Sequence, residues 1–148
     1  SPQGLSALLW SGGCTALDLR ASADYRKGHI PGSKWSIRPK IADAVKDPSL
    51  PVVLIADDPA VAKLAALDLR VAGVADVGLL AGGIAAWKGD GQSLNAAEDM
   101  PPDSERIDFV FHTLGRNEGN LAAARAYLAW EIALTDQLDA QERSSFRI

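Results

Sequence analysis

The chain has 148 residues, 47% of them apolar and 23% charged, with a net charge of −4, which fits one globular domain with an appended segment. The acidic balance provides no basic surface for nucleic acid, and no stretch has the roughly 18 uninterrupted apolar residues of a membrane span. One cysteine can form neither an internal disulfide nor a thiolate metal cluster, so we expect a cytoplasmic protein without a metal or another cofactor.

The first part of the chain predicts a helix, a buried strand and a shaped loop. Ser1 followed by Pro2 is a good helix start, and Gly12-Gly13 ends that helix. The run CTALDL at residues 14–19 has the length and apolar character of a buried strand. A loop with glycines and a proline then leads into a short strand near residues 34–37, and residues 39–47 are weakly helical.

The next part alternates strands and helices. PVVLIA at residues 51–56 is the clearest central strand, and a helix is predicted over residues 59–72. A strand near residues 77–80 and a short helix that holds Trp87 follow. This order predicts an α/β fold with a central parallel sheet covered on both faces. Ligands of such sheets bind beyond the carboxyl ends of the strands, so the turn after Ile55 is the expected functional position.

The composition changes near Asn95, where a polar stretch with prolines begins. We expect residues 95–116 to form a linker or wrapping segment, and residues 117–148 to form a helical extension that packs on a domain of residues 1–94. The apolar pattern predicts a long helix in the extension, ending near Thr135. Two shorter elements are also predicted: a strand at residues 108–111 and a last helix begun by the capping-box pair Asp139 and Glu142.

Two stretches of the sequence resemble the two halves of a rhodanese domain. LDLRASADYRKGHIPGSKW, at residues 17–35, is similar to the first half, where an Asp-x-Arg strand end precedes a Gly-His-Ile-Pro-Gly loop. VVLIADDPAVAKLAALDLRVAGVADVGLLAGGIAAW, at residues 52–87, is similar to the second half. The resemblance covers about residues 4–94 and implies a rhodanese-like three-layer α/β domain. The residues that match its structural motif, and are expected to serve architecture, are Asp18, Arg20, His29, Pro31, Gly32, Gly82, Gly83 and Trp87.

The resemblance also implies where an active site would lie. Rhodanese-like sulfurtransferases carry sulfur as a persulfide on a cysteine directly after the central strand, and the matching position here is Ala56. The family's loop also contains an arginine that binds the sulfur donor. In this chain the loop has neither, so we expect no catalytic residue and interpret it as a vestigial active-site loop, formed by Ala56, Asp57, Asp58, Pro59, Ala60, Val61 and Ala62.

The residue types around this loop argue against covalent chemistry. Covalent catalysis needs a side chain that can be activated, and residues 51–92 contain no Cys, Ser, Thr, Tyr or His. Each aspartate would repel a thiosulfate charge about 5 Å away by roughly 3 kcal/mol at an effective dielectric of about 20. That repulsion exceeds the ~0.3–1 kcal/mol that a helix dipole offers. Cys14 would lie about 16 Å from the end of its strand, at ~3.3 Å per residue, so we expect a buried core thiol.

The acidic pair after the central strand has further interpretations. Asp58 is a good N-cap and Pro59 a good first helical residue, so the pair is expected to start a helix. Asp57 and Asp58 also resemble the magnesium-holding pair of response-regulator receivers, with Asp99 near the phosphoacceptor position, although SLNAAED before it is not an apolar strand. The pair could also bind a metal without the other receiver features.

We therefore predict a rhodanese-fold domain without sulfurtransferase activity of its own. The chain begins Ser1-Pro2-Gln3 without an initiator methionine, so we expect a C-terminal module of a longer sulfurtransferase that moves sulfur from thiosulfate to cyanide or another thiophilic acceptor. The expected partners are other rhodanese-like modules of the same polypeptide or a second copy of the chain. The alternatives are a docking or self-association module that uses the C-terminal helix, and a metal-binding or receiver-like domain that uses Asp57 and Asp58.

Overall fold

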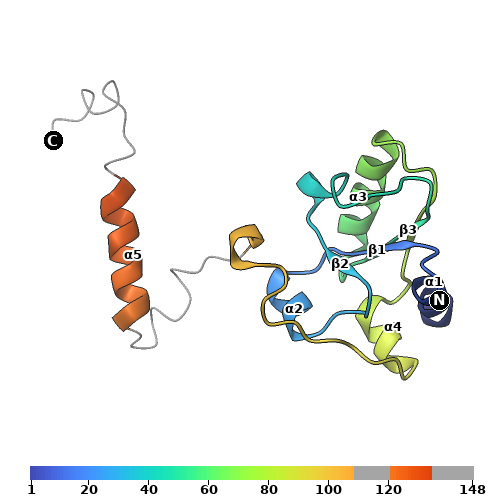
Figure 1. Ribbon diagram of the computed structural model, residues 1–148, viewed down its shortest axis with the longest axis horizontal. Helices are drawn as coiled ribbons and strands as arrows, with labels where there is room; N and C mark the ends of the chain where they lie inside the picture. Colours follow the sequence, from blue (N-terminus) through green and yellow to red (C-terminus); the bar gives the residue numbers. More distant parts are fainter. Residues whose placement is uncertain (109–120, 135–148) are drawn as a thin grey trace. The chain divides into compact units, whose positions relative to one another are not determined.

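The computed structural model describes residues 1–108 and 121–134, which belong to two units. Residues 1–108 form the first unit, which holds the sheet (Figure 1). The described part of the second unit is one helix, α5, at Leu121–Leu134. The predicted long helix is therefore present, and it ends one residue before Thr135. The predicted strand from residue 109 onward and the capping box at Asp139 lie outside the described residues.

The sheet of the first unit has four parallel strands in the order β2-β1-β3-β4. The register places Leu17 beside Leu54 and Asp18 beside Ile55, so β1 and β3 end at the same edge. This arrangement confirms the predicted central parallel sheet. The strands are β1 at Thr15–Asp18, β2 at Lys34–Trp35, β3 at Val52–Ile55 and β4 at Val77–Leu79.

Helices cover both faces of the sheet, which gives the predicted three layers. Helix α3 lies on one side, and α1 and α4 lie on the other (Figure 1). The α-helices of the first unit are α1 at Pro2–Trp10, α2 at Ser22–Lys27, α3 at Pro59–Val71 and α4 at Gly83–Gly89. Two 3₁₀ turns occur at Arg38–Lys40 and Asp103–Glu105.

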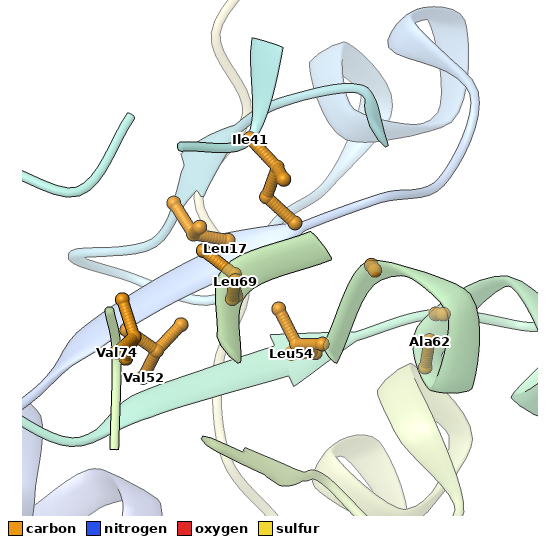
Figure 2. Close-up of a cluster of buried hydrophobic side chains, with 9 residues drawn as sticks. Leu17, Ile41, Val52, Leu54, Ala62, Leu69 and Val74 are labelled. Carbon is orange, nitrogen blue, oxygen red and sulfur yellow. The ribbon is translucent and has the colours of Figure 1, made fainter. Parts of the chain in front are cut away.

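The core under α3 is built from every second residue of the strands. Leu17, Val52 and Leu54 point to this face and pack against Leu69 of α3 (Figure 2). Burying side chains of this size stabilises a fold by about 1.5–3 kcal/mol each. Small residues on α3 allow the helix to lie close to the sheet. The other buried members of this cluster are Ile41, Ala56, Ala62, Ala65 and Val74.

The second core fills the opposite face with the alternate residues. Ala16 and Ile55 point there, because successive side chains of a strand lie on opposite faces. Trp87 of α4 is 3% exposed, and its indole N–H donates to the Ser93 carbonyl oxygen at 2.8 Å. The remaining buried members are Leu5, Ile30, Leu80 and Ile84.

One element departs from the sequence prediction, because helix α2 lies where a loop was expected. Its N-cap, Ala21, makes no side-chain capping bond, so the local sequence contains no start signal. Burial holds the helix instead: Tyr25 is 5% exposed and its hydroxyl donates to the Ser33 carbonyl oxygen at 2.7 Å. Tertiary packing has overridden weak local propensity here.

Residues 95–108 lie against α2. Arg26 donates to the Pro101 carbonyl oxygen at 3.1 Å through Nε. The backbone N–H of Ser22 donates to Asp108 at 2.7 Å, and Arg106 donates to the Ser22 hydroxyl at 2.9 Å. These contacts make the stretch part of the first unit, which extends to Asp108. The packing of residues 117–148 on the domain remains a prediction.

Candidate functional site

The turn after β3 is short. Ala56 follows Ile55 directly and is 8% exposed, with its methyl group in the core cluster under α3. Asp57 and Asp58 are exposed, and α3 begins at Pro59. The predicted vestigial loop of residues 56–62 is thus a three-residue turn followed by the first turn of a helix.

Asp58 is engaged in starting α3. Its Oδ1 accepts a hydrogen bond from the backbone N–H of Ala60 at 2.8 Å, and Pro59 occupies the first helical position. The geometry confirms the prediction that Asp58 is an N-cap. A carboxylate also interacts favourably with the positive end of the helix dipole. This aspartate therefore has a structural role that needs no ligand.

Two glycines form the start of α4, Gly82 as its N-cap and Gly83 as its first residue, and the helix begins close to the turn. Gly82 has φ of +74° and Gly83 has φ of +52°, the left-handed region that favours glycine. A Cβ on Gly83 would lie 3.1 Å from the carbonyl oxygen of Ala56. A Cβ on Gly82 would lie 2.7 Å from the Cβ of Ala86. Gly83 is thus required by the close approach of α4 to the backbone of the turn, whereas Gly82 is required by the first turn of α4 itself.

Asp18 and Arg20 form a buried ion pair at the end of β1. The Asp18 side chain is fully buried and that of Arg20 is 7% exposed. Arg20 Nη2 donates to Asp18 Oδ2 at 2.7 Å and to the Gly28 carbonyl oxygen at 2.8 Å. The indole of Trp35 donates to the Arg20 carbonyl oxygen at 2.9 Å. The pair thus connects the end of β1 to the following loop and to β2.

His29 shapes the loop that follows α2. Its Nδ1 donates to the Tyr25 carbonyl oxygen at 3.0 Å, and the two rings stack at 4.0 Å. Its backbone exchanges two hydrogen bonds of 2.9 Å with Asn95. Burial raises the pKa of the Tyr25 hydroxyl above its ordinary value. Gly32, after Pro31, has φ of +84°, so the loop turns where only glycine is unstrained.

Cys14 lies at the opposite edge of the sheet from Ala56. Thr15 pairs with Val52 at the start of both strands, and Cys14 precedes this pair, whereas Ala56 follows the end of β3. Cys14 is half-buried and not fully buried as predicted; its side chain packs against the edge of the second core, and this partial burial raises the pKa of the thiol. The thiol is therefore distant from the turn and ionises less readily than an exposed thiol.

The receiver-like interpretation of the acidic pair is wrong. Asp99 lies in a turn over residues 98–101 with no strand before it, and two strands, β1 and β2, precede the acidic pair. Within residues 1–108 and 121–134, no group of three or more His, Cys, Asp or Glu side chains could hold a metal ion. The described helices include none that is both long and apolar enough to cross a membrane.

Comparisons with known proteins agree with this geometry. A sequence model of the rhodanese-like domain matches residues 1–90. A crystal structure of thiosulfate sulfurtransferase from Pseudomonas aeruginosa matches with 31% identity and a TM-score of 0.67, covering 93% of this chain and 26% of that chain. The Rhodanese_3-like domain of the Alr3790 protein from Anabaena sp. matches with 30% identity and a TM-score of 0.51, covering 55% of this chain and 97% of that chain. A search of curated protein sequences found no significant match.

The match to the Pseudomonas enzyme extends beyond the first unit. Residues 1–108 make up less than three quarters of the chain, and the match covers 93% of it, so it includes part of the second unit. The chain spans about a quarter of that enzyme. Since the family model covers more than half of the sequence and the parallel sheet has the expected architecture, the chain belongs to the rhodanese-like domain family.

Proposed function

We propose that this chain is a rhodanese-homology domain without sulfurtransferase activity of its own, which serves as a structural or regulatory module of a larger sulfurtransferase. The observation that carries the proposal is the methyl group of Ala56 at the position where the family has its cysteine. A methyl group cannot hold a persulfide, and residues 51–92 contain no other thiol, hydroxyl or imidazole.

The charges at the turn support the same conclusion. Sulfur donors such as thiosulfate are anionic, and the turn presents Asp57 and Asp58 where the family has an arginine. Both aspartates are exposed, so solvent screens their repulsion below the roughly 3 kcal/mol expected at about 5 Å with an effective dielectric of about 20. The turn still lacks a cation that would attract the donor, because its residues 56–62 include no Lys or Arg.

The role as a module is supported by the comparison with the Pseudomonas enzyme. That enzyme is named a thiosulfate sulfurtransferase, and this chain resembles about a quarter of it. A protein of that length has room for other rhodanese-like domains, one of which would hold the reactive cysteine. The proposed partners of this chain are therefore such modules in the same polypeptide, or a second copy of the chain.

A sulfur-transfer assay on the full 148-residue chain tests the absence of activity. The chain is incubated with thiosulfate and cyanide, and thiocyanate is measured. We expect no more thiocyanate than with the heat-denatured chain. A Cys14→Ser variant shows whether any signal depends on the single thiol. Thiocyanate formed at an ordinary enzymatic rate would overturn the proposal.

A gain-of-function pair tests the two missing features separately. Ala56→Cys, made in the Cys14→Ser background, restores a thiol at the turn, and adding Asp57→Arg reverses one charge while leaving the Asp58 cap intact. In this reaction the thiolate introduced by Ala56→Cys attacks the outer sulfur of thiosulfate, the S–S bond of thiosulfate breaks and sulfite leaves. We expect the single change to form little persulfide and the double change to form more, because an arginine attracts the anionic donor. Intact-mass measurement of a +32 Da adduct, about one sulfur atom, reads out the reaction. Equal adduct formation in both would show that charge does not limit this turn.

A docking role for the C-terminal helix is a second candidate function. On α5, Leu121, Leu128 and Ile132 recur at helical spacing and are 61%, 54% and 69% exposed, so they form an apolar stripe that a partner could cover. Measuring the oligomeric state of the chain with and without residues 109–148 tests this role. The truncated chain keeps residues 95–108, which bind α2. We expect the shortened chain to lose self-association or binding to sibling modules. Unchanged size and unchanged solubility would count against docking.

A further inference from the structure

A small pocket lies between α2 and α4, away from the turn after β3. Its volume is about 220 Å³, and none of its lining residues belongs to the vestigial loop of residues 56–62. That volume is below the ~300–1,000 Å³ typical of pockets for drug-sized ligands, so it suits a smaller molecule. The side chains that line it include Arg20, Asp24, Lys27, Ile84, Lys88 and Leu94.

Arg20 lines this pocket with a largely buried side chain. Its Nε and Nη2 are taken by Asp18 and the Gly28 carbonyl oxygen, and Nη1 has no protein partner among the described residues. Every fully buried side-chain nitrogen of the described residues has a hydrogen-bond partner. Because Nη1 has none among these residues, it is not fully buried and is accessible to solvent. The Arg20 side chain is 7% exposed overall, and it is one of the side chains that line this pocket.

The charges around the pocket leave one positive charge uncompensated. Arg20 is balanced by Asp18, and Lys27 is paired with Asp24 at 3.3 Å. Lys88, on α4, has no ion pair within residues 1–108 and 121–134. A bound anion with one negative charge would therefore neutralise the positive charge of Lys88. A doubly charged anion would leave the pocket with a net negative charge and would be repelled by the Asp24 carboxylate.

Two apolar side chains form the rest of the wall. Ile84 is 8% exposed and Leu94 is partly buried, and both belong to the second core. From these features we propose that the pocket binds a short-chain monocarboxylate, with the carboxylate at Arg20 Nη1 and the Lys88 ammonium and the aliphatic chain against Ile84 and Leu94. Charge-assisted hydrogen bonds of this kind are about twice as strong as neutral ones.

Titration of the full chain with butyrate, followed by amide chemical shifts in ¹⁵N-labelled protein, tests the proposal. We expect saturable shifts at Gly28, Ile84 and Lys88 at millimolar butyrate. Butyramide has the same shape without the charge, and it should bind more weakly. Phosphate and chloride carry negative charge but have no aliphatic part, and they should also bind more weakly than butyrate. Equal saturation by butyramide, or by phosphate, would overturn the proposal.

A matched pair of lysine variants separates the pocket from general charge effects. Lys88→Met removes the uncompensated charge, and Lys63→Met makes the same change at an exposed lysine of α3 that does not line this pocket. We expect Lys88→Met to weaken butyrate binding up to about fivefold, as the loss of one exposed charge contact implies, and Lys63→Met to leave it unchanged. No saturation in the parent chain at tens of millimolar butyrate, or equal loss in both variants, would reject the site.

Discussion

The carboxylate of Asp58 accepts a hydrogen bond from the backbone N–H of Ala60 at 2.8 Å, while its neighbour Asp57 is exposed without such a bond in the described structure. Two adjacent aspartates thus have different roles in one turn. The first helical turn of α3 depends on Asp58, because helix N-termini leave N–H groups without backbone partners. Asp57 contributes only charge.

Replacing these two aspartates should therefore have unequal effects on stability. Asp58→Ala should lower the free energy of unfolding by about 1 kcal/mol, the usual cost of losing an N-cap. Asp57→Ala should change it by less than about 0.5 kcal/mol, as is common for exposed positions. Urea denaturation of both variants measures the difference. Equal loss in the two variants would contradict the assignment of the cap to Asp58.

Substitution of Gly83 should test the contact between α4 and the turn. Gly83→Ala places a Cβ 3.1 Å from the Ala56 carbonyl oxygen and strains a backbone at φ of +52°. Gly73→Ala strains a backbone at φ of +93° but meets nothing within 4 Å. Both should be destabilised by on the order of 1 kcal/mol from backbone strain, and Gly83→Ala by more because of the added contact. Thermal unfolding gives the comparison, and a smaller loss for Gly83→Ala would contradict it.

Removal of Arg20 should be far more damaging than removal of an exposed arginine. Arg20→Met leaves the fully buried Asp18 carboxylate without its ion-pair partner, which typically costs about 3–5 kcal/mol. Asp18→Asn with Arg20→Met removes both charges and should recover part of that loss. Denaturant unfolding of the single and double variants measures the recovery. An additive loss in the double variant would show that the two residues do not act as a pair.

The sequence predicted most of the fold because its strongest signals are local. The continuous apolar run of β3, and the capped start of α3 at Asp58 and Pro59, predict elements that the structure contains. The six-residue helix α2 was missed because Ala21 offers no cap and the helix depends on the burial of Tyr25. The spacing of apolar residues along the sequence does not indicate when packing against the rest of the fold will stabilise a short helix.

The site was only partly accessible from sequence for a similar reason. The absence of a thiol, hydroxyl or imidazole within residues 51–92, which include Ala56, follows directly from the amino-acid sequence. The pocket at Arg20 depends on side chains 68 positions apart, Arg20 and Lys88, which only the folded chain brings together. The hydrogen bond from Arg20 to the Gly28 carbonyl oxygen likewise could not be predicted from the spacing of the two residues in the sequence.

Acid should weaken the surface pair of Arg38 and Asp68. Their side chains lie 2.8 Å apart, and this hydrogen bond lowers the pKa of Asp68 below its ordinary value. A lowered folded-state pKa adds stability above the unfolded pKa, and this stability is lost as pH falls through the folded pKa. Arg38→Ala should therefore be slightly less stable than the parent at neutral pH and equal to it in strong acid. Arg70→Ala, on the exposed face of α3, is the control.

Cys14 should react slowly with alkylating reagents despite being the single thiol of the chain. Burial raises its pKa, so less thiolate is present at a given pH than in the unfolded chain, and the thiolate is the reactive form. The neutral thiol contributes stability below the unfolded pKa, and this contribution fades as pH rises through the folded pKa. Iodoacetamide labelling followed against pH should therefore have a higher midpoint for the folded chain than for the chain in urea. A midpoint at or below the unfolded one would indicate a nearby cation and reopen Cys14 as a reactive residue.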